Sequence, residues 1–156
     1  MKAVLISIRP EWCDLIARGE KTLEVRKTKP KIDTPFKCYI YCTKAPKGWF
    51  WLNSPNIRRD GVVIGEFICD RYVIDRTFGH DAVINAAACM TEIQCAVYSC
   101  GSPLYGWHIS KLKIYEKPKK LSDFTGIKTM RDGFELRILE RPPQSWCYVM
   151  EVNCNG

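Results

Sequence analysis

The segment 8–27 constrains the fold most strongly, because its hydrophobic period changes in the middle. Pro10 suits the first position of a helix, since its missing N–H group would have no intrahelical partner there. Three apolar side chains then recur at helical spacing and form one face: Trp12, Leu15 and Ile16. Gly19 stands where a helix commonly ends in a left-handed residue. The segment therefore predicts a helix over residues 10–18 that stops at Gly19.

From residue 22 the period becomes two, which predicts a strand over residues 22–27. Leu23 and Val25 point to one side of such a strand. Glu24 and Arg26 point to the other side, about 7 Å apart. If the apolar pair faces the core, the charged pair shares the opposite face, which we expect to line a cleft.

The pattern Gly19-x-Lys21-x-x-Glu24-x-Arg26 after a proline-led helix resembles the signature of the ASCH domain, a branch of the PUA-like β-barrels. Further segments fit the same family: 65–67 in a long strand, 105–109 leading into another, and 142–148 near the end. The resemblance spans nearly the whole chain. It implies an α+β, mainly β fold: a small PUA-like β-barrel with two or three flanking helices.

The resemblance bears on activity as well. One ASCH branch contains small amidohydrolases that act on acylated cytidine with a lysine, a threonine nucleophile and a glutamate. Lys21 matches that lysine, but Glu24 stands where the threonine is expected, and Thr22 lies two residues earlier. A carboxylate cannot replace a hydroxyl nucleophile without a change of mechanism. The resemblance therefore leaves Lys21 and Glu24 as catalytic candidates for a small hydrolase, either an amidohydrolase on a modified nucleoside or a ribonuclease.

Periodicity along the rest of the chain predicts further strands over 3–8, 36–42, 62–74, 107–116 and 146–152. Helices are expected over 81–88, where the pattern is weak, and from 91 to 97 or 98. Residues 125–140 show no decisive pattern. Many strands with few helices and local connections favour a closed or half-open barrel. With 156 residues, of which 46% are hydrophobic and 26% charged, the chain predicts a single domain over 1–156.

Positive charge concentrates near the beginning of the chain. The net charge is +7, and residues 1–50 hold eleven Lys/Arg against five Asp/Glu, a net of +6. Such a surface attracts polyanions, so the expected partner is single-stranded RNA or a nucleotide-like ligand. Two alternatives stay open: a solvated lysine-rich loop without a partner, and a protein-interaction module that docks on an acidic surface. The sequence assigns no oligomeric state.

The nine cysteines are an odd number and include no CxxC pair. Several fall in apolar strand patterns, where cysteine behaves as a small hydrophobic residue. We expect nine reduced thiols in a cytoplasmic protein, with no bound metal and no cofactor. No apolar run has the length of a membrane span, and the first residues read as a strand and not as a signal peptide.

Most residues of the candidate binding site for RNA or a nucleotide-like ligand are cationic or aromatic. The site consists of Lys21, Thr22, Glu24, Arg26, Lys29, Trp49, Trp51, His108 and Trp146. Aromatic rings interleaved with cations are what single-stranded nucleic acids stack upon. The same residues also allow structural interpretations. Alternating tryptophans can fill a core, a lone histidine can be structural, and Lys21, Glu24 and Arg26 can form a salt-bridge network that holds a strand in place.

Overall fold

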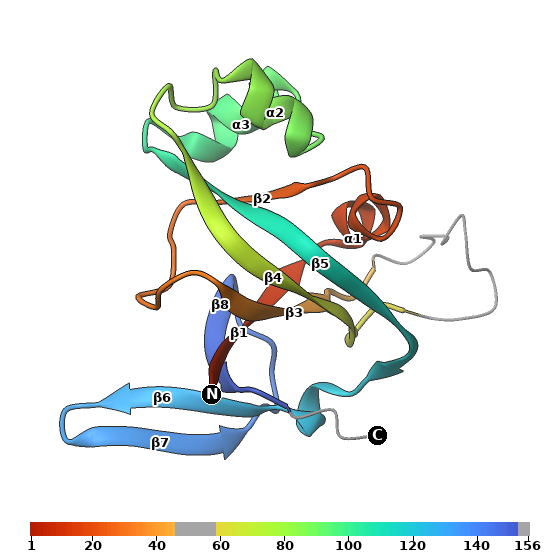
Figure 1. Ribbon diagram of the computed structural model, residues 1–156, viewed down its shortest axis with the longest axis vertical. Coiled ribbons are helices and arrows are strands. Elements are labelled where there is room, and N and C mark those ends of the chain that lie inside the picture. The colour runs from red at the N-terminus through yellow and green to blue at the C-terminus, as the bar shows by residue number, and fades with distance from the viewer. Residues whose placement is uncertain (46–58, 153–156) are drawn as a thin grey trace. The chain divides into compact units, whose positions relative to one another are not determined.

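The computed structural model describes residues 1–45 and 59–152 (Figure 1). These residues are mainly β, with three α-helices and one 3-10 helix. The elements in chain order are β1 (Lys2–Ile8), α1 (Pro10–Ala17), β2 (Leu23–Arg26), β3 (Phe36–Cys42), β4 (Val62–Asp75), α2 (Ala82–Ala87), α3 (Glu92–Ser99), β5 (Leu104–Lys119), η1 (Leu121–Asp123), β6 (Thr125–Met130), β7 (Gly133–Ile138) and β8 (Trp146–Met150). The predicted α+β, mainly β class is confirmed.

The eight strands hydrogen-bond in the order β2-β5-β4-β3-β1-β8-β6-β7. β1 runs parallel to β3 and antiparallel to β8. This order has two ends, β2 and β7, so the described strands form an open sheet. The expected closed or half-open barrel is not confirmed. Within the same residues no helix is long and apolar enough to cross a membrane.

The chain divides into two compact units, and each is assembled from separate segments. Unit 1 comprises Met1–Cys13, Lys37–Glu66 and Lys113–Gly156, and unit 2 comprises Asp14–Phe36 and Phe67–Leu112. The long strands β4 and β5 therefore contribute residues to both units. That residues 1–156 form one domain stays a prediction.

Unit 1 has an aromatic core. Alternate residues of β1 and β3 point to the same side, and Leu5 is aligned with Tyr39 in the parallel register. The rings of Tyr39 and Phe124 meet at 4.9 Å between centroids, edge to face. The buried cluster consists of Ala3, Leu5, Tyr39, Tyr41, Val63, Tyr115, Phe124 and Val149.

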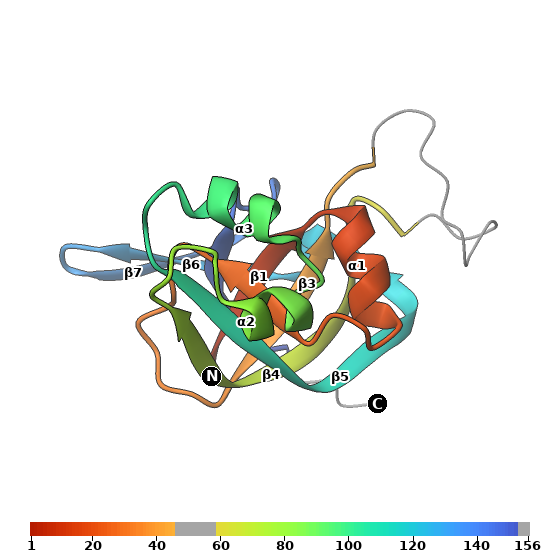
Figure 2. The same cartoon turned by 90° about the horizontal axis from the view of Figure 1, so that it is seen from above.

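Unit 2 packs β2 against two short helices. Figure 2 shows α2 and α3 as neighbouring helices. Leu23 and Val25 pack with Ile84 of α2, which confirms that the apolar face of β2 belongs to a core. The Asp81 side chain accepts from the backbone N–H groups of the first turn of α2. This cap explains why a helix forms in a stretch with weak periodicity. Thr91 forms a capping box at the beginning of α3.

The unassigned stretch 125–140 contains a hairpin, β6 and β7. Its strands pair in register from Thr125 opposite Ile138 to Met130 opposite Gly133. All six residues of β7 are exposed. A strand without a buried face needs no alternation of apolar and polar residues, so periodicity could not reveal it.

Candidate functional site

The signature of the sequence lies between the end of α1 and the first residues of β2, in unit 2. Gly19 adopts a φ of +77°, which the sequence predicted for the residue that stops the helix. β2 then pairs with β5, with Glu24 opposite Trp107 and Arg26 opposite Tyr105. Because residues directly opposite in a sheet share a face, the charged pair lies on the same side as Trp107.

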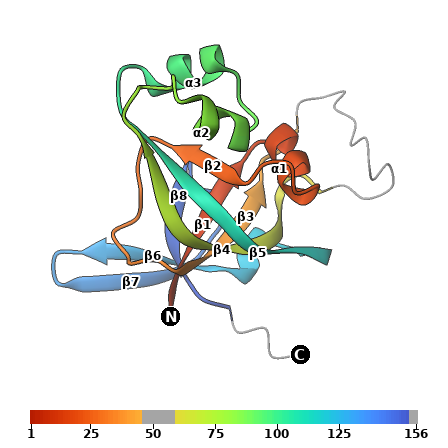
Figure 3. The same ribbon diagram turned by 45° about the horizontal axis from the view of Figure 1, so that its top comes forward.

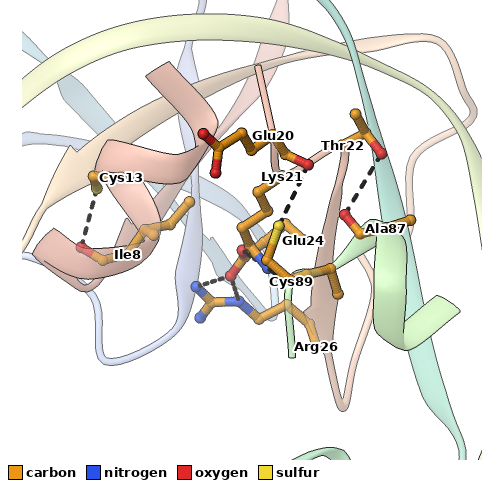
Figure 4. Close-up of polar contacts among 10 residues, drawn as sticks. Ile8, Cys13, Glu20, Lys21, Thr22, Glu24, Arg26, Ala87 and Cys89 are labelled. Carbon is orange, nitrogen blue, oxygen red and sulfur yellow. Dashed lines mark hydrogen bonds and ion pairs between the residues drawn. The ribbon is translucent and has the colours of Figure 1, made fainter. Parts of the chain in front are cut away.

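Lys21, Glu24 and Arg26 form one charge network (Figure 4). Arg26 donates from Nε and Nη2 to Oε1 of Glu24, at 3.0 and 2.8 Å. Nζ of Lys21 lies 3.4 Å from Oε2 of the same carboxylate and donates to the backbone carbonyl of Ala88 at 2.7 Å. The three residues are only 3%, 5% and 9% exposed, in sequence order. The salt-bridge network that the sequence allowed for Lys21, Glu24 and Arg26 is therefore present in the structure.

This network carries two positive charges on one carboxylate, so its formal sum is +1. Buried charges persist when they are paired and hydrogen-bonded, and both oxygens of Glu24 are used in that way. All four residues of β2 are buried, so its charged face is shielded from solvent. The geometry fits the structural salt-bridge interpretation, and the cleft at this face stays a prediction.

Helix α3 brings two side chains to the network, and sequence reasoning missed both. Burial raises the pKa of the Tyr98 hydroxyl. The positive charge of Arg26 lowers this pKa, and the negative charge of Glu24 raises it. Burial also raises the pKa of the Cys95 thiol, against a lowering influence of Lys21. A thiol held in its neutral form is a poor nucleophile. The three-residue spacing of this pair on a helix was the available signal.

Exposed lysines follow the network along the chain and lie over tyrosine rings. Nζ of Lys27 is 5.2 Å from the ring centroid of Tyr98, and Nζ of Lys29 is 5.2 Å from that of Tyr72. We call these four residues the basic rim. Lys29 was a predicted binding residue, whereas the two tyrosines were not. Cations over aromatic faces at this distance attract one another.

Thr22 is exposed, and its backbone connects β2 to two neighbours. Its N–H group donates to the carbonyl of Ala87 at 2.9 Å, and its own carbonyl accepts from the N–H group of Ile109. The hydroxyl contacts the same Ala87 carbonyl at 3.5 Å. The backbone of Thr22 thus holds the beginning of β2 against α2 and β5, beside the network.

His108 lies on β5, opposite Leu23 in the β2–β5 register. By strand alternation its side chain belongs to the sheet face opposite that of Glu24. Its Nδ1 atom is 2.6 Å from Oδ1 of Asp70, and Oδ2 of Asp70 is 3.3 Å from Nη1 of Arg71. The structure therefore places His108 in a second polar cluster and does not bring it to the network.

The remaining predicted residues are three tryptophans. Trp146 is half-buried on β8 in unit 1, where its ring packs against that of Tyr148 at 5.4 Å. Trp49 and Trp51 lie outside the described residues. No group of three or more His, Cys, Asp or Glu side chains suited to a metal ion occurs within residues 1–45 and 59–152. The eight cysteines in those ranges are free thiols, and Cys154 lies beyond them.

Comparisons with known proteins identify a family and a shared fold. Residues 6–98 match the family profile of the ASCH domain. The chain is similar to a crystal structure of ASCH from Zymomonas mobilis, with 21% sequence identity, a TM-score of 0.67, and coverage of 96% of this chain and 88% of that chain. The chain is also similar to a serine-to-alanine mutant of that protein, with 20% sequence identity and a TM-score of 0.67. This match covers 96% of this chain and 89% of that chain. At this identity the similarity shows a shared fold alone. A search of curated proteins found no match.

Proposed function

The chain belongs to the ASCH domain family, and we propose that it binds single-stranded RNA, or a nucleotide-like ligand, at the β2 signature and the basic rim. The family is PUA-like and generally RNA-binding, which supports this choice of partner. The ligand class also suits the net charge of +7.

One observation carries the proposal: the positive network continues along the chain into the basic rim. Lys27 and Lys29 are exposed and each lies over a tyrosine ring. Ammonium groups neutralise phosphates, and tyrosine rings offer faces on which bases stack. In this arrangement Glu24 and Lys21 hold Arg26 and β2 in place, and the rim makes the contacts with the ligand.

The test is a titration of labelled single-stranded RNA at two salt concentrations. Binding releases counterions from the phosphates, and this release becomes less favourable as the salt concentration rises. The affinity for RNA is therefore expected to fall steeply with salt. A variant with Lys27→Ala and Lys29→Ala should lose affinity and reduce the salt slope by about 1.4, which is about 0.7 for each phosphate contact on a single strand. The matched control removes two exposed lysines of β5, Lys113 and Lys117, and should change the affinity less. Absence of binding at low salt would exclude the proposal.

The hydrolase alternative uses the same network, with Lys21 and Glu24 as working groups. Lys21 donates to a backbone carbonyl and pairs with Glu24, so its ammonium group is held in place. Replacing it distinguishes the two functions. In Lys21→Arg, a binding protein should lose little affinity for RNA, whereas a lysine-dependent hydrolase should lose nearly all turnover of nucleoside or RNA substrates.

We also propose that residues 1–156 act as one PUA-like domain in the cytoplasm. β4 and β5 supply residues to both units, so neither unit is a continuous piece of chain. The free thiols support a reducing compartment. A single unfolding transition, with the same midpoint by fluorescence and by circular dichroism, is expected for one domain. Two separated transitions would contradict it.

A further inference from the structure

Strand β7 forms an exposed end of the sheet in unit 1. β6 is its neighbour on one side, and within residues 1–45 and 59–152 no strand pairs with its other side. Figure 3 shows the β6–β7 hairpin projecting beyond β8. An open strand edge presents unpaired N–H and C=O groups to any strand that can approach it.

The direction of these backbone groups follows from one hydrogen bond. The N–H group of Leu139 donates to the carbonyl of its partner Phe124 at 3.0 Å. Hydrogen-bonded and non-bonded pairs alternate along an antiparallel ladder. Glu135 and Arg137 therefore bond to β6 through their backbones. The residues that alternate with them turn their backbone N–H and C=O groups to the open edge. These residues are Phe134, Leu136 and Ile138.

The same three residues carry exposed apolar side chains. Phe134 is 69% exposed, Leu136 47% and Ile138 62%. Leu139 has the opposite parity and packs against the core of unit 1, so the apolar stripe lies on the face turned away from that core. Three large apolar side chains in a row on an open edge are typical of an interaction surface.

We propose that β7 pairs with β7 of a second copy of this chain, antiparallel and centred on Leu136. This register places Glu135 opposite Arg137 of the partner subunit, and the two-fold symmetry repeats the pair. It also places Phe134 opposite Ile138 of the partner subunit. Opposite charges and apolar pairs directly across a ladder both stabilise it.

The backbone permits this register, and the charges select it. Centring on Leu136 joins two outward-facing residues as a hydrogen-bonded pair, and centring on Glu135 or Arg137 also sets outward-facing residues opposite each other. A register centred on Glu135 sets two carboxylates opposite each other, and one centred on Arg137 sets two guanidinium groups opposite each other. Like charges at such positions are destabilising. Self-complementarity therefore selects a second copy as the occupant.

Sedimentation equilibrium of the whole chain tests the proposal. The average mass should rise from 18.0 kDa toward twice that value between about 1 µM and about 1 mM protein, the range of weak association. Glu135→Arg and Arg137→Glu should each weaken the dimer by about tenfold or more, because each creates two like-charge contacts. The double variant Glu135→Arg/Arg137→Glu should restore it.

A mixture of the two single variants separates the interface from the hairpin. Residues 135 and 137 share one face of β7, so the double variant also removes a repulsion within its own strand. An equimolar mixture of Glu135→Arg and Arg137→Glu keeps that repulsion in each chain, yet it should form mixed dimers, because every charge pair across that interface is opposite in sign. Asp33→Arg, in an exposed loop, is the matched charge control and should leave the dimer unchanged. A monomer at all concentrations, or a double variant as weak as the singles, would overturn the proposal.

Discussion

Two nitrogen atoms of Arg26 donate to the same carboxylate oxygen of Glu24, at 3.0 and 2.8 Å. This arrangement leaves the second oxygen for Lys21, at 3.4 Å. One carboxylate therefore pairs with two buried cations. Glu24→Ala should lower the free energy of unfolding by about 3–5 kcal/mol, because both cations lose their counter-charge. Urea unfolding measures the change.

The control for this prediction is Glu20→Ala. Glu20 is exposed and pairs with Arg18 at 3.5 Å on the surface, so its loss should cost about 0.5 kcal/mol or less. If Glu24→Ala unfolds at the same urea concentration as this control, the network does not stabilise β2.

Asp70 and His108 predict a pH dependence. Burial raises the pKa of Asp70. The hydrogen bond with His108 and the charges of His108 and Arg71 lower it by more, so the net pKa of Asp70 is lowered. A carboxyl group with a lowered pKa in the folded state adds stability above its unfolded pKa, about 3.9. This stability is lost as the pH falls through the folded pKa. Asp70→Asn should therefore destabilise the protein at neutral pH and have little effect at about pH 2.

Thermal unfolding of the parent and of Asp70→Asn between pH 7 and pH 2 checks this direction. Asp33→Asn, an exposed carboxylate, serves as the control. If the difference in melting temperature between the parent and Asp70→Asn stays constant from pH 7 to pH 2, the ionisation of Asp70 does not contribute to stability.

The thiols should react in an order set by burial. Burial raises the pKa of Cys69 to about 12 and that of Cys147 to about 11, whereas Cys100 is exposed. The thiolate is the reactive form, so Cys100 should be alkylated before the other two in the folded protein at about pH 8. Mass spectrometry of peptides from timed samples follows each site. Under denaturing conditions all nine thiols should react, and fewer would indicate a disulfide or a bound metal.

Gly79 and Gly101 form a matched pair for the helix contacts of unit 2. Both have a positive φ, +98° and +78°. A Cβ atom at Gly79 would lie 2.4 Å from the backbone nitrogen of Ala96 in α3, whereas one at Gly101 would meet nothing within 4 Å. Gly101→Ala should cost about 1 kcal/mol for backbone strain alone. Gly79→Ala should cost several kcal/mol, because α3 must also move. Equal melting temperatures for the two variants would contradict this contact.

Local patterns in the sequence determined several elements and one charge pair. A proline start, helical spacing and a glycine stop predicted α1, and strict alternation predicted β3 with the observed bounds, Phe36–Cys42. The pairing of Glu24 with Arg26 was predictable for the same reason. Residues two apart on a strand share a face, so their geometry depends on the backbone of that strand alone.

Only the tertiary structure decided what surrounds this pair. The carbonyl of Ala88, which receives Lys21, lies 67 positions further along the chain. Tyr98 and Tyr72 reach the rim lysines from α3 and β4. The burial of both faces of β2 and the open edge of β7 depend on which segments pack beside these strands. The period of a strand gives the parity of its side chains, but the contacts of each face are fixed only when distant segments pack together.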